Sequence, residues 1–335
     1  MKTSITFLSL LFSIVFAQNW DIVRMTPMPE AVTNNAVCEG FANDSSYILS
    51  FGGLDTTKTY TGIHLKSWRY NVEQDAWMSI PDLPDTLGKI ASGATHWQGV
   101  VFIMGGYHVF SNGNERSSDK VHRYDIASNA YLPDGVPIPV ATDDHVQAIW
   151  RDSLIYVISG WNNTRNIPNV QVYNPEQDTW IAGTPVPNNN LYKSFGASGT
   201  IIGDTIYYFG GASMGFNFPI QNNLRKGVID PNNPSQIQWS QRVVNTGTNG
   251  YRMASTSVGN TLHWLGGSGL TYNYDGIAYN GSGGVSPLNR DLSILANDTA
   301  QWKSSSNYSI PMDLRGIANM SDTIKFISGG MSANQ

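Results

Sequence analysis

The 335-residue sequence is poor in charge and in cysteine. Only 13% of its residues are charged, and its net charge of −5 argues against a nucleic-acid partner, which favours a basic surface. Cys38 is the single cysteine, so the chain has neither a disulfide framework nor a cysteine-rich metal site. We expect Cys38 to be a buried, inert thiol rather than a nucleophile.

Long apolar runs are also scarce, and the longest lies at the N-terminus. The 12 residues Ile5–Phe16 follow Lys2 and end before Ala17. This run falls short of the ~20 residues that span a bilayer. We therefore predict a secretory signal peptide over residues 1–17, cleaved near Ala17, and a secreted (extracellular or periplasmic) mature chain over residues 18–335 without a membrane span.

Two short elements recur along the mature chain. The first is an apolar strand that ends in a pair of small residues, and its copies lie 51 to 63 residues apart. The pairs are Gly52-Gly53, Gly105-Gly106, Ser159-Gly160, Gly210-Gly211, Gly266-Gly267 and Gly329-Gly330. The second is an aromatic or apolar residue followed seven positions later by another aromatic. Its copies are Tyr70 and Trp77, Tyr124 and Tyr131, Tyr173 and Trp180, and Leu295 and Trp302.

A repeat of about 50 residues is typical of a four-stranded propeller blade. Dipeptides such as Asn43-Asp44 and Gln98-Gly99 fit hairpin turns between the first and second strands. The small pair after strand two allows positive φ and close backbone approach. A series of sandwich domains does not explain such a pair at the same place six times. The sequence therefore predicts an all-β, six-bladed β-propeller.

The glycine pair, the Tyr and the Trp seven residues later resemble the kelch-repeat family across residues 20–335. The resemblance implies blades over residues 33–80, 88–134, 144–183, 191–242, 250–305 and 313–335, with an N-terminal strand over 18–24 completing the last blade. That sixth blade stops before its third strand, so we expect the sequence to be a truncated fragment. Kelch propellers host many functions, so the fold alone does not define the activity.

Strand direction places the loops at two ends of the propeller. Loops that join strands one to two and three to four are short, whereas those at the opposite end are long, notably 107–119, 161–168, 212–223 and 268–289. Long loops in compact domains are usually functional or disordered. The long-loop face is therefore the candidate binding face. Its aromatic side chains suit sugar rings, although they also suit packing of the loops; the candidates are Trp161, Phe216, Tyr272 and Tyr274.

A mostly basic set of residues lies near the start of strand one, 14 to 17 positions before each glycine pair. Its members are Asn35, Lys89, His145, Lys193, Arg252 and Arg315. If they occupy equivalent positions on the innermost strands, they ring the mouth of the central channel and favour an anionic ligand. The alternative is that they hydrogen-bond to the backbone of neighbouring blades.

Catalytic motifs are weak. In Asp143-Asp144-His145 adjacent residues point to opposite faces of a strand, so at most Asp143 and His145 converge. The six histidines lack metal-ligand spacing, and we predict no metal and no cofactor. Of the enzymes that share the kelch fold, galactose-oxidase-like proteins need a Cys–Tyr pair and histidine ligands, which Cys38 alone does not supply. Kelch-type sialic acid mutarotases use an arginine and a carboxylate; Arg252 or Arg315 fits, but no glutamate lies at an equivalent inner position.

These patterns predict a monomeric secreted module that binds a glycan or an extracellular protein. The alternative is an isomerase similar to N-acetylneuraminate mutarotases or epimerases, with its site in a cationic channel. Six N-x-Ser/Thr sequons leave glycosylation open; they begin at Asn43, Asn162, Asn280, Asn297, Asn307 and Asn319.

Overall fold

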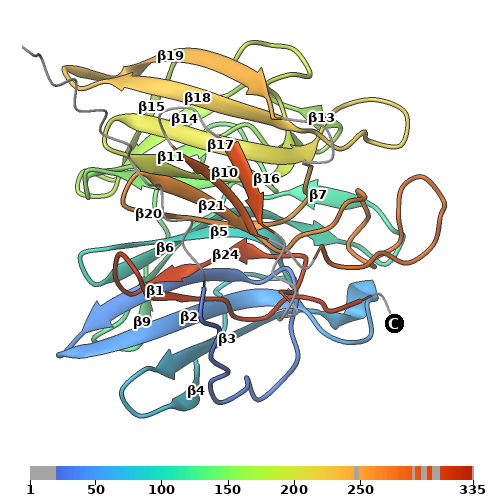
Figure 1. Cartoon of the computed structure of the whole chain (residues 1–335). Coiled ribbons are helices and arrows are strands. Elements are labelled where there is room, and N and C mark those ends of the chain that lie inside the picture. The colour runs from blue at the N-terminus through green and yellow to red at the C-terminus, as the bar shows by residue number, and fades with distance from the viewer. Residues whose placement is uncertain (1–19, 245–248, 289–290, 296–299, 304–309, 334–335) are drawn as a thin grey trace, which may run out of the picture.

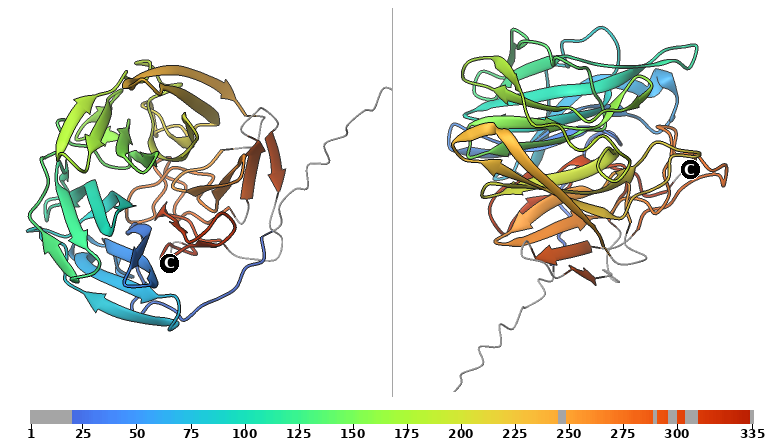
Figure 2. Two further views of the ribbon diagram at one scale, coloured as in Figure 1. Left: turned by 90° about the vertical axis from the view of Figure 1, so that its left-hand side faces the viewer. Right: turned by 90° about the horizontal axis from the view of Figure 1, so that it is seen from above.

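The computed structural model describes residues 20–244, 249–288, 291–295, 300–303 and 310–333. Antiparallel sheets are arranged radially around a central axis, and the last described residues lie beside the first sheet (Figure 1, Figure 2). The described residues contain no helix long and apolar enough to cross a membrane, and their one helical element is the 3-10 turn η1 (Tyr60–Gly62). The predicted signal peptide lies outside the described residues.

Five sheets each contain four consecutive blade strands, numbered one to four from the axis outward. The first two blades comprise β1 (Ala36–Ala42), β2 (Ser45–Leu54), β3 (Ile63–Asn71) and β4 (Ala76–Ile80), then β5 (Ile90–Trp97), β6 (Val100–Val109), β8 (Val121–Asp125) and β9 (Ala130–Leu132). The third comprises β10 (Val146–Trp150), β11 (Leu154–Ile158), β14 (Val170–Asn174) and β15 (Thr179–Ala182).

The fourth and fifth blades follow the same order. They comprise β16 (Phe195–Ile202), β17 (Thr205–Ala212), β18 (Asn223–Asp230) and β19 (Asn233–Val243), then β20 (Ala254–Val258), β21 (Thr261–Leu265), β22 (Asp291–Leu295) and β23 (Ala300–Lys303). Three short strands lie in the long loops: β7 (Glu115–Ser117) pairs with β6, and β12 (Trp161–Asn162) pairs with β13 (Arg165–Asn166).

The hydrophobic core lies between adjacent blades rather than along the axis. Tyr156 and Val172 of the third blade, for example, pack against Ile206 and Tyr208 of the fourth. Strand two is apolar on both faces because a neighbouring blade covers each face, and Ile155–Ile158 are all fully buried. This arrangement confirms the predicted all-β propeller.

The predicted hairpin turns are confirmed by their backbone angles. Asn43 and Asp44 have φ of 51° and 57°, and Arg151 and Asp152 have φ of 51° and 46°. Positive φ at both central residues is the signature of a type I′ turn, whose twist matches that of the flanking strands. The one-to-two connections therefore stay short, as the sequence indicates.

The glycine pairs perform the role predicted for them. All six pairs have positive φ, and the backbone N–H of each second glycine donates to a carbonyl of the next blade. The bonds are Gly53 to Lys89 (2.9 Å), Gly106 to Thr142 (3.1 Å), Gly160 to Ser194 (3.0 Å), Gly211 to Gly250 (2.8 Å), Gly267 to Pro311 (3.3 Å) and Gly330 to Val32 (2.9 Å). The last of them joins the end of the chain to its beginning.

The sixth repeat is only partly built. β24 (Arg315–Gly316) pairs in parallel with β1, and β25 (Ala318–Asn319) pairs with β26 (Lys325–Phe326) as a two-stranded sheet. Within the described residues no third strand joins this sheet. Five blades are therefore complete, and the predicted count of six stays a prediction.

Candidate functional site

Six residues around the axis, one from each repeat, share a left-handed backbone conformation. We call them the inner ring: Asn34, Ala91, Asp144, Gly196, Arg252 and Asp313, with φ between 48° and 65°. Neighbouring members are joined by backbone hydrogen bonds such as Ala91 N–H to the Asn34 carbonyl (3.3 Å) and Gly196 N–H to the Asp144 carbonyl (2.9 Å). Asn34 N–H donates to the Asp313 carbonyl (3.2 Å), and the step from Arg252 to Asp313 is made by Leu314 N–H, which donates to the Arg252 carbonyl (3.0 Å).

The predicted basic set does not occupy equivalent positions, so that expectation is wrong. Arg252 alone belongs to the inner ring. Asn35 and His145 lie one residue after it and Arg315 two residues after it, whereas Lys89 and Lys193 precede it by two and three residues. Counting back from the glycine pair fails because the spacing from the inner ring to that pair varies; it is 18 residues from Asn34 to Gly52 but 14 from Ala91 to Gly105.

Arg252 is the centre of a buried ion cluster at the mouth of the channel. Its Nη2 donates to Asp144 Oδ2 (2.7 Å), and its Nη1 donates to Asp313 Oδ1 (2.9 Å). Arg315 Nη1 lies 3.3 Å from Asp144 Oδ1. The rings of Tyr251 and Tyr272 flank the Arg252 guanidinium, with centroids 5.0 and 5.4 Å from its carbon.

This cluster is formally neutral because two arginines face two aspartates. Burial works against ionisation of Asp144, but Arg252 and Arg315 lower the pKa of that carboxyl below its usual range. Burial also opposes the charge of Arg252, yet Asp144 and the surrounding groups raise the pKa of the guanidinium well above its usual value. The expected concentration of positive potential at the mouth is therefore cancelled, and Asp144, Arg252 and Asp313 are themselves almost fully buried there.

Lys89 lies in a separate buried cluster. Its Nζ lies 2.6 Å from Asp85 Oδ2 and donates to His122 Nε2 at 3.0 Å, while His122 Nδ1 donates to Asp134 Oδ1 at 2.9 Å. Burial lowers the pKa of Lys89, and the nearby Asp85 opposes that change. Lys89 thus pairs with side chains, whereas Arg315 Nη2 donates to the backbone carbonyl of His145 (2.9 Å), as the alternative predicts.

The remaining members of the set have local partners. Asn35 Nδ2 donates to Ser50 Oγ (2.8 Å), and the backbone N–H of the half-buried Lys193 donates to the Asn189 carbonyl (3.0 Å). His145 Nε2 lies 3.1 Å from Gln147 Oε1. Burial lowers the pKa of His145 to about 4, so its ring is neutral at physiological pH.

The residues Asp143, Asp144 and His145 do not converge on a catalytic point. Asp143 accepts a hydrogen bond from Ser117 Oγ, whereas Asp144 faces Arg252 and His145 faces Gln147. The described residues contain no group of three or more His, Cys, Asp or Glu side chains that could hold a metal ion.

The long loops pack over the closed channel mouth and against one another. Trp161 makes edge contacts with Phe195 and Phe218, whose ring centroids lie 5.3 and 5.6 Å away. Tyr272 is fully buried against Arg252, and the half-buried Tyr274 packs on a cluster of β2, β3 and β6 residues. Of the four predicted loop aromatics, Trp161, Tyr272 and Tyr274 therefore pack the loops, and Phe216 points to solvent.

Hydrogen bonds between different loops brace this face. Asn163 Oδ1 accepts from Ser117 N–H (3.0 Å), and Ser117 Oγ in turn accepts from Asn163 N–H (2.9 Å). Asn190 Nδ2 donates to the Met214 carbonyl (2.7 Å), and Thr271 Oγ1 donates to the Phe218 carbonyl (2.8 Å). β7 lies in the loop 107–119 and β13 in the loop 161–168, and both strands lie at the same end of the propeller (Figure 1).

Several large apolar side chains are nevertheless exposed on the long-loop face. Phe216 is 90% exposed at the tip of its loop. Four others are between 41% and 46% exposed: Tyr60, Leu191, Leu270 and Ile277. Phe216 in particular is a large aromatic side chain that a braced loop holds out to solvent, where a partner can contact it.

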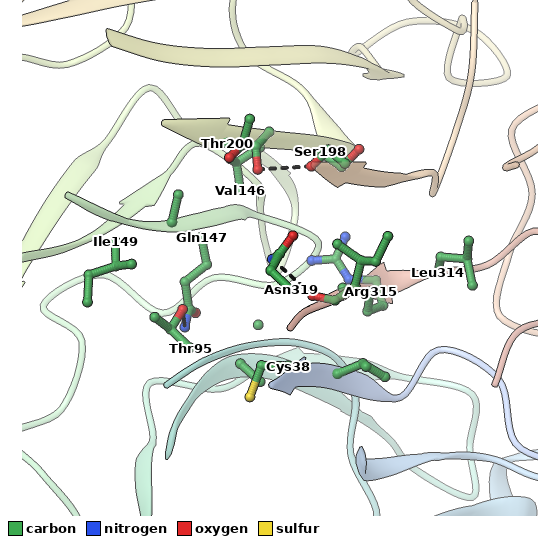
Figure 3. Close-up of a pocket in the computed structure, with 18 of the residues that line it drawn as sticks. Cys38, Thr95, Val146, Gln147, Ile149, Ser198, Thr200, Leu314, Arg315 and Asn319 are labelled. Carbon is green, nitrogen blue, oxygen red and sulfur yellow. Dashed lines mark hydrogen bonds between the residues drawn. The ribbon is translucent and has the colours of Figure 1, made fainter. Parts of the chain in front are cut away.

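A second feature is a cavity of about 250 Å³ in the central channel. Its lining residues lie on the first strand of each blade and come after the inner-ring residues in the sequence. The cavity therefore lies on the side of the ring away from the long loops. Figure 3 shows Thr95, Gln147, Ser198, Asn319 and Arg315 around this space. Asn319 is exposed, so the cavity reaches solvent on the short-turn side.

Sequence reasoning missed one carboxylate in this cavity. Glu39 lines it from β1, and its Oε2 accepts the Asn319 N–H at 2.8 Å. Burial raises the pKa of Glu39, although the hydrogen bond from Asn319 opposes the change. A charged residue in the middle of an innermost strand was the available signal. Cys38 beside it is buried, and burial raises the pKa of its thiol, as expected of an inert cysteine.

Comparisons with known proteins agree with the repeat. The family profile described as Kelch motif matches residues 152–187, which form most of the third blade. Kelch-like protein 36 of Bos taurus is 24% identical over 172 residues, covering 51% of this chain and 26% of the relative. The Rab9 effector protein with kelch motifs of Homo sapiens is 31% identical over 146 residues, covering 43% of this chain and 37% of the relative.

A solved structure titled "Structure of YjhT" aligns with 89% of this chain and 90% of its own, with a TM-score of 0.68 and 14% identity. At that identity the likeness concerns the fold. The chain spans between a quarter and two fifths of the two curated relatives named above. The repeated glycine pairs, the radial sheets and these matches together identify the chain as a kelch-repeat β-propeller.

Proposed function

We propose that this protein is a secreted binding module whose long-loop face recognises an extracellular protein or glycan. The observation that carries the proposal is the set of exposed apolar side chains, led by Phe216 at 90% exposure, on loops braced by cross-loop hydrogen bonds. A surface that is already ordered loses little conformational entropy when a partner binds. The name of the matched Rab9 effector protein with kelch motifs favours a protein partner.

Two further parts of the proposal concern the whole chain. The inner ring and the bonds from the glycine pairs each have six members, which supports a six-bladed monomeric propeller. The apolar run before Ala17 supports secretion.

The test compares the wild-type mature chain with two double variants. Phe216→Ser/Ile277→Ser alters the long-loop face, and Val228→Ser/Val243→Ser removes exposed apolar groups from the outer strands of the fourth blade as a matched control. Each protein is applied to an array of neutral and acidic oligosaccharides and, separately, cross-linked to extracellular proteins with the cross-linked residues mapped by mass spectrometry.

Loss of binding in the loop variant alone, with cross-links mapped to the long loops, supports the proposal. Equal binding by all three proteins, or cross-links confined to the outer strands, overturns it. Circular dichroism melting of each variant checks that its fold is intact.

The channel cavity favours a second candidate, a sugar isomerase of the mutarotase type. Opening and closing a sugar ring needs groups that exchange protons. Glu39, with its raised pKa, fits that need, and Arg315, whose charge is paired with Asp144, also lines the cavity. The carboxylate beside Arg252 and Arg315 is Asp144, but its charge is already paired. Faster anomer exchange of an acidic sugar by NMR, abolished in Glu39→Gln and retained in the loop variant, favours this candidate over the first.

A further inference from the structure

A polar cavity of about 460 Å³ lies on the long-loop face beside the second blade. Its wall comes mainly from the loop 107–119 and from residues 84–86, which belong to the connection that leads into this blade. The cavity shares no lining residue with the channel cavity, and its volume is in the range of small-molecule sites. The side chains used below are Asp85, His108, Arg116 and Lys120.

Two hydrogen-bond acceptors lie close together in the wall of this cavity. The Nδ1 of the buried His108 donates to the Gly88 carbonyl (2.9 Å), so that nitrogen carries the ring proton. Burial lowers the pKa of His108, and Nε2 of the neutral ring is therefore an acceptor. Nε2 lies 3.7 Å from Asp85 Oδ2, and no described residue donates a hydrogen bond to it.

The carboxyl of Asp85 is ionised. Burial opposes its ionisation, but the neighbouring His122 and Lys89 lower the pKa of Asp85 below its usual range. Oδ2 lies 2.6 Å from Lys89 Nζ, and Oδ1 accepts the Thr86 N–H (2.8 Å). Since each carboxylate oxygen can accept two hydrogen bonds, Asp85 keeps acceptor capacity for a ligand.

The other blades show that closure of a blade does not need this carboxylate. His122, Gln171 and Arg225 occupy equivalent positions, because each pairs with the residue two places before the small-residue pair of its blade. Gln171 and Arg225 donate to backbone carbonyls of the connection that leads into their own blades (3.0 and 2.8 Å). His122 instead lies 3.3 Å from Asp85 Oδ2. The departure from backbone bonding favours a role for Asp85 in binding.

The cations around the cavity limit the class of ligand. Arg116 is exposed, packs 5.5 Å from the Phe110 ring and forms no ion pair within the described residues. Lys120 Nζ lies 3.7 Å from Asp134 Oδ2. A ligand ammonium group in the cavity would be repelled by Arg116, Lys120 and the buried Lys89. A hydroxyl group donates without a charge, and an anionic group on the same ligand can pair with Arg116.

We propose that this cavity binds an acidic sugar residue of a glycan, that is, a monosaccharide with a carboxylate. Adjacent hydroxyls of the sugar donate to Asp85 Oδ2 and His108 Nε2, which are 3.7 Å apart, and its carboxylate accepts from Arg116. A site built to hydrogen-bond a hydroxyl rejects ligands that lack one, because its buried acceptors then stay unpaired. The inference rests on the proposed loop-face function and names the ligand class of that face.

The test uses methyl glucuronide, which has the required hydroxyls and carboxylate. Its methyl group blocks opening of the sugar ring, so isomerase activity does not interfere. Methyl glucoside, which lacks the carboxylate, is the first control ligand. Butylamine is the second and stands for the lysine side chain of a partner protein. Calorimetric titration measures the affinity of each ligand for the wild-type mature chain.

The same titrations are made with variants of the cavity. Arg116→Gln removes the cation for the carboxylate. Its matched control is Arg165→Gln, because Arg165 is an exposed arginine on β13 at the same end of the propeller and does not line the cavity (Figure 1). His108→Phe removes the Nε2 acceptor, and circular dichroism melting checks its fold. If His108→Phe fails to fold, the surface variant Arg116→Gln still decides the result.

We expect the glucuronide to bind the wild type, Arg165→Gln and Phe216→Ser/Ile277→Ser equally, and to bind Arg116→Gln and His108→Phe roughly tenfold more weakly. The glucoside should lose affinity for the wild type by a similar factor. No glucuronide binding, equal affinity for the glucoside, binding of butylamine instead, or binding that the cavity variants leave unchanged overturns the proposal. The loop-face function is judged separately by the array and cross-linking tests, because Phe216 and Ile277 lie outside this cavity.

Discussion

At the scale of single residues, the ion cluster around Arg252 explains the closed channel mouth. The cluster joins residues that are 61 and 108 positions apart in the sequence, so it links blades rather than neighbours in one sheet. Burying ions is costly, and the cluster is tolerable because each charge has a partner with good geometry. Removing one partner leaves a buried charge without the attraction that offsets its loss of hydration.

We therefore predict that Arg252→Ala lowers the free energy of unfolding by about 3–5 kcal/mol, since it removes the arginine paired with Asp313 and leaves Asp144 with Arg315 alone. The matched control is Arg151→Ala, whose half-exposed side chain lies 2.8 Å from Asp204. That surface pair should contribute at most about 1 kcal/mol. Urea titration measures both values, and equally small losses would contradict the assigned role of Arg252.

His145 predicts a pH dependence of stability. Its pKa is lowered by burial from the ordinary 6.5 to about 4, so the unfolded chain binds a proton at a higher pH than the folded one. Its contribution is fully present above pH 6.5 and is lost as the pH falls towards 4, a change of roughly 3 kcal/mol. Denaturant titrations across that range should show that the free energy of unfolding depends less on pH in His145→Gln than in the wild type. An equal pH dependence in the two proteins would refute the assignment.

At the scale of elements, the sequence predicts what depends on local backbone chemistry. The glycine pairs and the turn dipeptides need positive φ, and their spacing alone defines a blade. The mouth of the channel could not be predicted in the same way. The position of Arg252 opposite Asp144 depends on how two blades face each other across the axis. The spacing of residues within one strand does not determine that contact. Glu39 was not predicted because the predicted basic set marks the mouth, whereas Glu39 lies further along β1.

The glycine pair offers a test with an internal control. Gly106 has φ of 84°, and an added Cβ would overlap Ser92 Oγ and the Ile90 carbonyl. Gly113 has nearly the same φ, 80°, but lies in open space. Gly113→Ala should lower the free energy of unfolding by only about 1–2 kcal/mol, which is the cost of a left-handed backbone conformation for alanine. Gly106→Ala should cost clearly more, since its Cβ also clashes with strand one of the same blade. Thermal melting that ranks the two variants equally would contradict this interpretation.

At the scale of the whole molecule, closure and recognition lie on different surfaces. Two sets of backbone bonds, from the inner ring and from the glycine pairs, hold the blades around the axis. The ion cluster and the packed aromatics close one end of the channel, which leaves the braced loops as a continuous outer face. The cavity opens at the opposite end. The two ends of the channel can therefore be tested independently.

The most direct test of the central claim is hydroxyl-radical footprinting of the protein with and without the tightest binder from the array or the cross-linked partner. The account predicts that oxidation falls at Phe216, Leu270 and Ile277 and is unchanged at Val228 and Val243 on the outer strands. Protection at the outer strands, or protection confined to the channel residues around Glu39, would contradict the claim that the long-loop face is the binding surface.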